Sequence, residues 1–160
     1  MKIFRKLKTA VLNALRQGWS PEAVSWSVAV GVTWAIFPIY GITMATLGII
    51  GVVWKLNHPI MQSINYLMAP VKFILIIPYI RLGEWMFRPE QPFTLSIPEF
   101  TLRFKEAPLE TLAEFAATFL HAIAGWGLSV PFVVAGSYVL TRLILHTGET
   151  ARTAISEAHS

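Results

Sequence analysis

Two features that proteins commonly use for chemistry are missing from the 160-residue sequence. The chain has no cysteine, which excludes disulfides, thiolate nucleophiles and cysteine-ligated metal centres. Aspartate is also absent, so the DxD and DxDxG patterns that bind divalent metals cannot occur. The histidines lack HExxH spacing, and no nucleotide-binding or GxSxG motif is present. We therefore expect no metal, no cofactor and no enzymatic activity.

Charged residues are also scarce. Only 14% of the residues are charged and 54% are hydrophobic, and the mean hydropathy is +0.55. Soluble domains carry about 25% charged residues, so this composition predicts a small all-α integral membrane protein with one domain over residues 1–160. The formal net charge is +4. Because the basic residues lie beside apolar segments, anionic lipids are favoured as partners over nucleic acid.

Residues 1–17 predict an amphipathic helix with a basic polar face. Apolar residues recur at helical spacing from Phe4 to Leu15, and no acidic residue precedes Glu22. Such a helix suits the inner surface of the membrane, which places the N-terminus in the cytoplasm. A plain positive-inside topology signal without a specific lipid partner is the alternative. No cleavable signal peptide is evident, so we expect the membrane segments themselves to target the chain.

The next apolar segment is too long for one straight crossing. Residues 23–54 carry no charged side chain, and a helix of that length would reach roughly 48 Å, against a hydrocarbon core of about 30 Å. Pro38 and Gly41 lie at its middle and predict a break. A second apolar segment, residues 59–80, is interrupted by Pro70. The sequence thus predicts two successive broken helices.

Signals for helix starts and ends surround these segments. Ser20 is a candidate N-cap, and Pro21 suits the first helical position. Pro59 does the same for the second segment, which residues 78–83 are expected to close. The broken-helix core is therefore placed at residues 21–83.

Residues 84–108 form a different kind of segment. A period-two alternation of apolar and polar residues on either side of Pro98 predicts an amphipathic β-hairpin near residues 93–105. Its apolar face is expected to pack on the helices or on the lipid surface, because a lone hairpin is marginal in water.

The last apolar segment predicts C-terminal membrane helices over residues 109–146. Residues 115–141 carry no charge, and Gly125-Trp126-Gly127 and Pro131 offer places where this segment can bend or divide. Residues 147–160 are expected to be a polar tail.

Two topologies remain open for this arrangement. In the first, the broken segments are hairpins that enter and leave on the cytoplasmic side. In the second, three bent segments span the membrane. The distribution of basic residues favours the first, with both termini in the cytoplasm.

A series of short motifs links the central segment to a known family. These motifs are Gly18-x-Ser20-Pro21, Gly31, Phe37-Pro38-x-x-Gly41, Leu56-Asn57-x-Pro59, Pro70 and Arg81-Leu82-Gly83. In this order and spacing, residues 18 to about 87 resemble DUF2062, a family of bacterial membrane proteins. The resemblance implies a small multi-helix protein of the bacterial inner membrane, sometimes joined to glycosyltransferase-like modules, with no established activity. The family often has Gln and Asn-Pro where this chain has Thr43 and Ala69-Pro70.

The breaks are the best candidates for a binding site. Every backbone polar group inside lipid must be satisfied, so a break is tolerated only within protein or beside a cavity, as in transporters. If the breaks at Pro38 and Pro70 meet, a set of polar side chains surrounds them: Tyr40, Thr43, Gln62, Ser63, Asn65, Lys72 and Arg81. The alternative is that the breaks only shape the helix bundle.

Lys72 is the most informative of these residues. A lysine at the bilayer midplane costs roughly 2.5–3.5 kcal/mol on insertion scales, so it calls for a compensating partner. A bound anion, Glu84 or snorkelling to an interface would each provide one. Arg81 and Glu84 are three residues apart and are also able to pair with each other.

Three functions remain in view. The leading hypothesis is a non-enzymatic membrane protein that binds or translocates an anionic lipid or small amphiphile at its broken helices. The alternative is a structural or accessory subunit of a larger membrane complex, or a homo-oligomer. An intramembrane enzyme ranks third, because no acid, base and nucleophile set is visible.

Overall fold

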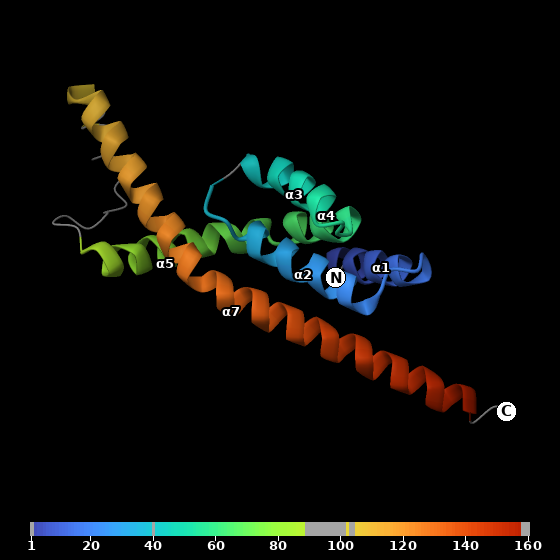
Figure 1. Ribbon diagram of the computed structural model, residues 1–160. Helices are drawn as coiled ribbons and strands as arrows, with labels where there is room; N and C mark the ends of the chain where they lie inside the picture. The colour runs from blue at the N-terminus through green and yellow to red at the C-terminus, as the bar shows by residue number, and fades with distance from the viewer. Residues whose placement is uncertain (1, 40, 89–101, 103–104, 158–160) are drawn as a thin grey trace.

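The computed structural model describes residues 2–39, 41–88, 102 and 105–157. Within these residues it is all-helical, which confirms the predicted all-α class (Figure 1). The named helices are α1 (Lys2–Arg16), α2 (Pro21–Ala35), α3 (Ile42–Val53), α4 (His58–Leu67), α5 (Ala69–Phe87) and α7 (Pro108–Glu157).

Side-chain caps fix where two of the helices begin. The Ser20 side chain accepts a hydrogen bond from the Ala23 amide at 3.1 Å, as predicted, and Pro21 follows in the first turn of α2. The Asn57 side chain caps α4 in the same way, accepting from the Ile60 amide at 3.1 Å. In both cases a polar N-cap residue sets the start, and a proline follows one or two positions later.

Both predicted breaks are present. α2 ends at Ala35 and α3 begins at Ile42, after Gly41 with a φ of 90°. Glycine adopts this left-handed conformation without the steric penalty of a Cβ. α3 then folds back beside α2 and α4 (Figure 1). The second break lies between α4 and α5, whose axes are bent by 66°.

The predicted end of the second segment at residues 78–83 is wrong, since α5 continues through Pro78 to Phe87. Gly83 serves the packing of α5 against α7 instead. A Cβ on Gly83 would collide with the backbone carbonyl of His121. A small residue allows the two helix backbones to approach closely.

α7 is one helix of 50 residues, so the predicted C-terminal segment is not divided. It changes direction near its crossing with α5 (Figure 1). Gly125 lies at this crossing, where a Cβ would collide with the Tyr79 carbonyl. The helix also runs beyond residue 147 to Glu157, whereas the sequence suggested a polar tail there. Gly125, which in the sequence suggested a helix break, therefore lies inside a continuous helix and lets α7 pack closely against α5.

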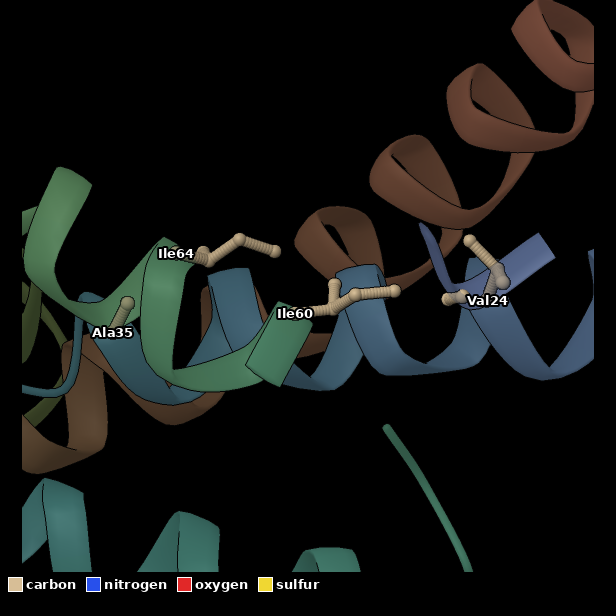
Figure 2. Close-up of a cluster of buried hydrophobic side chains, with 5 residues drawn as sticks. Val24, Ala35, Ile60 and Ile64 are labelled. Carbon is tan, nitrogen blue, oxygen red and sulfur yellow. The ribbon is translucent and has the colours of Figure 1, made fainter. Parts of the chain in front are cut away.

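Small apolar clusters hold the helices together. One consists of Ala14, Val24, Ala35, Ile60 and Ile64, and Figure 2 shows its members on α2 and the neighbouring α4. Gly31 allows this contact, because a Cβ there would lie 3.2 Å from the Met61 Cα. Further clusters join α2, α3 and α4 around Leu47, and α5 and α7 around Tyr79.

Large apolar side chains also cover much of the outside. Ile74 on α5 is 72% exposed and Phe132 on α7 is 75% exposed. Within the described ranges, one helix is long and apolar enough to cross a membrane, Leu109–Thr147 of α7. There are two if the bent pair α4 and α5 counts as one span.

Most of the β-hairpin predicted at residues 93–105 lies outside the described residues. At its described positions, Leu102 and Lys105, the backbone is helical rather than extended. No strand occurs in the part of the chain that the structure describes. The period-two pattern therefore does not produce strand geometry at these two positions.

Candidate functional site

The two breaks meet through a pair of buried polar side chains. Lys72, near the start of α5, is only 3% exposed. Its Nζ donates to Oγ1 of Thr43, in the first turn of α3, at 3.4 Å. Thr43 is also buried. The first turns of the helices that follow the two breaks are thus joined, although Thr43 and Lys72 are 29 positions apart in the sequence.

A second polar contact reaches the same turn of α3 from α4. Nε2 of Gln62 donates to the Met44 carbonyl at 3.2 Å. The Tyr66 hydroxyl lies 3.7 Å from Sδ of Met44. We call Thr43, Met44, Gln62, Tyr66 and Lys72 together the break junction. It draws residues from α3, α4 and α5.

The electrostatic character of the junction is positive. The N-cap residue of α3 is Gly41, which has no side chain to cap the helix, and the first turn of α3 contains no acidic residue. The free amides and the macrodipole give this helix end a partial positive charge. The Lys72 ammonium adds a full charge beside it. An anion is therefore the ligand that complements this place best.

Other candidate residues lie elsewhere or contribute less. Tyr40 is outside the described residues. Ser63 and Asn65 are half-buried on α4, and no hydrogen bond joins them to α3 within the described chain. Of the predicted candidates, the structure brings together Thr43, Gln62 and Lys72.

Arg81 lies away from the junction. Its Nη1 donates to Glu84 Oε2 at 2.8 Å, which confirms the predicted pairing along one face of α5. The Arg81 side chain is 55% exposed, and its nine-residue offset from Lys72 corresponds to roughly 14 Å of helix. Glu84 is about 18 Å from Lys72 by the same measure. Glu84 pairs with Arg81 instead.

Tyr66 and Met44 were not among the predicted site residues. A signal for Tyr66 was present, because residues 62 and 66 share one face of a helix. Met44 contributes its backbone carbonyl, which no side-chain pattern reveals. Among the described residues, no group of three or more His or Glu side chains could hold a metal ion.

Protein groups close part of the first break. The Phe37 amide bonds to the Trp34 carbonyl rather than continuing the helix, and the Thr33 carbonyl accepts from Nε1 of Trp126 on α7 at 3.0 Å. This satisfies a carbonyl at the end of α2 within protein, as an apolar environment requires.

The arrangement defines an all-α protein with a long apolar helix and a buried, cationic junction between two broken helices. The chain belongs to the family described as "Uncharacterized protein conserved in bacteria (DUF2062)", whose model matches residues 4–154. The match confirms the resemblance and extends it from the central segment to nearly the whole chain. Neither the curated proteins nor the solved structures contain a match.

Proposed function

We propose that this protein is a non-enzymatic integral protein of the bacterial inner membrane that binds or translocates an anionic lipid or small amphiphile at the break junction. The observation that carries the proposal is the Lys72–Thr43 contact. A lysine 3% exposed sits where two broken helices meet. Ionisable residues held inside membrane segments commonly mark ligand or ion pathways.

The exposed apolar surface supports a membrane environment. Large apolar side chains on α3, α5 and α7, such as Val52, Ile74 and Phe132, are more than 70% exposed. Exposed apolar patches of this kind mark membrane or protein contacts. Contact between these side chains and lipid tails carries no hydrophobic free-energy penalty, whereas their contact with water does.

The helix directions support a specific topology. α2 and α3 measure about 22 Å and 18 Å, each shorter than the bilayer core, and together they form a re-entrant hairpin. Tyr79 and Gly83 of α5 meet Gly125 and His121 of α7 in reverse order, so these helices are antiparallel. We infer that α4–α5 crosses outward and α7 returns.

This topology places both termini in the cytoplasm. Eight of the 13 Lys and Arg residues then lie on the cytoplasmic side, within residues 1–58 and 142–160. Four lie on the opposite side, within residues 81–105, and Lys72 lies between. This distribution follows the positive-inside rule.

The test compares Lys72→Met with Lys55→Met, which removes one exposed charge at the end of α3. Each protein is purified from native membranes in mild detergent, and its bound lipids are measured by native mass spectrometry. We expect Lys55→Met to retain anionic lipid like the wild type and Lys72→Met to lose it. Equal retention by all three proteins would refute the proposal.

One observation favours the alternative role as a subunit of a larger complex. The C-terminal half of α7 exposes Leu140, Leu143 and Ile144, although the neighbouring Leu145 packs against the cluster around Ala14. A partner helix would cover these side chains as well as lipid does. Stoichiometric partner chains in the same mass spectra would establish that role instead.

A further inference from the structure

The break junction holds a buried acceptor as well as a cation. Oε1 of Gln62 is the buried side-chain atom that has no hydrogen-bond partner among the described residues. The orientation of this amide is fixed, because its Nε2 donates to the Met44 carbonyl. Turning the amide over would place two acceptor oxygens against each other. The unmet group is therefore an acceptor.

The acceptor and the cation serve neighbouring positions. Gln62 bonds to Met44 and Lys72 bonds to Thr43, so both side chains contact consecutive residues of α3. A buried acceptor without a donor lowers stability, whereas a ligand that supplies the donor removes that penalty on binding. A ligand for this junction thus needs a negative charge for Lys72 and a donor for Gln62.

We infer that the break junction recognises a phosphate ester that carries a hydroxyl or ammonium group beside the phosphate, and that Oε1 of Gln62 accepts a hydrogen bond from this group. The inference rests on the proposed binding function and specifies its ligand class. Phosphoglycerol and phosphoethanolamine head groups have both features. A phosphate ester with only a methyl group has the charge and lacks the donor.

The test uses two probes of equal charge in phosphatidylcholine nanodiscs that contain the full chain. Phosphatidylglycerol carries the donor hydroxyls, and phosphatidylmethanol lacks them. We expect the wild type to bind phosphatidylglycerol roughly five-fold more tightly, the typical effect of one net hydrogen bond. In Gln62→Met this ratio should fall to about one, while Lys72→Met should weaken both lipids by a similar factor.

A water-soluble pair separates a lipid from a free phosphate ester as the source. Glycerol phosphate and methyl phosphate are compared as competitors in the same nanodiscs. A preference for glycerol phosphate alone, without lipid selectivity, supports the same chemistry with a soluble ligand. Equal binding within both pairs by the wild type would overturn the inference and leave the proposed function intact. Failure of every anionic probe to bind would refute the proposed function itself.

Discussion

The crossing of α5 and α7 gives a sharp prediction from two glycines that lie two residues apart. A Cβ on Gly125 would collide with the Tyr79 carbonyl, whereas a Cβ on Gly127 would meet nothing within 4 Å. Both residues lie in the interior of α7, where alanine is favoured over glycine by about 1 kcal/mol. The two Gly→Ala variants therefore share their helix-propensity gain and differ only in the collision.

The size of the difference follows from this contact. The atom in the way belongs to the backbone of α5, so it cannot move without shifting that helix. Overpacking of this kind costs typically 1–3 kcal/mol. We expect Gly125→Ala to be destabilised by a net of up to about 2 kcal/mol, and Gly127→Ala to be stabilised by up to about 1 kcal/mol.

Thermal unfolding in detergent, followed by tryptophan fluorescence, measures both variants. For a chain of this size, 1 kcal/mol corresponds to about 2–4 °C in Tm. Gly125→Ala should melt a few degrees below the wild type, and Gly127→Ala at or above it. If both variants shift Tm in the same direction by the same amount, the close approach of α5 and α7 is refuted.

Two further predictions test the α2–α4 contact and the topology. Ser27→Ala removes the buried hydroxyl that accepts from the Asn57 backbone amide at 2.8 Å, so the free energy of unfolding should fall by about 1–3 kcal/mol in a denaturation assay. The control is Ser25→Ala, because the Ser25 hydroxyl donates to the Pro21 carbonyl of its own helix. This variant should change the free energy of unfolding far less. Single cysteines introduced at the exposed positions Gln17 and Glu106 should react with a membrane-impermeant maleimide from opposite sides of the inner membrane; labelling from the same side would contradict the two-crossing topology.

Local signals in the sequence predicted the breaks well. Ser20 caps a helix, the rings of Pro21 and Pro38 restrict φ, and Gly41 adopts a positive φ. Each of these effects depends only on residues close in sequence. The confirmed ends of α2 and α3 follow from them. Such features can be read without knowing which helices become neighbours.

The errors arose where tertiary contacts decide the outcome. Gly83 and Gly125 look like helix breakers in sequence, yet each lies inside a continuous helix and permits close packing. At residues 93–105 the period-two pattern suggested strands, while Leu102 and Lys105 are helical. Alternation over a short segment does not fix the backbone when packing favours a helix.

The candidate site was predictable in part. Placing polar residues around Pro38 and Pro70 brought Thr43, Gln62 and Lys72 together correctly, because the two breaks meet in space. Arg81 was included for its charge alone, but its i, i+3 partner Glu84 already engages it. The role of the Met44 carbonyl could not have been predicted, because every residue has a backbone carbonyl and the residue type does not distinguish this one.

The most direct test of the central claim is the distance between Lys72 Nζ and a lipid phosphorus atom. Solid-state NMR on protein with ¹⁵N-labelled lysine side chains in native lipids measures this dipolar coupling, and Lys72→Met assigns the signal. The account predicts that the assigned nitrogen lies within about 4 Å of phosphorus, as a charge-assisted hydrogen bond to a phosphate oxygen requires. A Lys72 signal without phosphorus coupling, in protein that still carries its lipids, would contradict it.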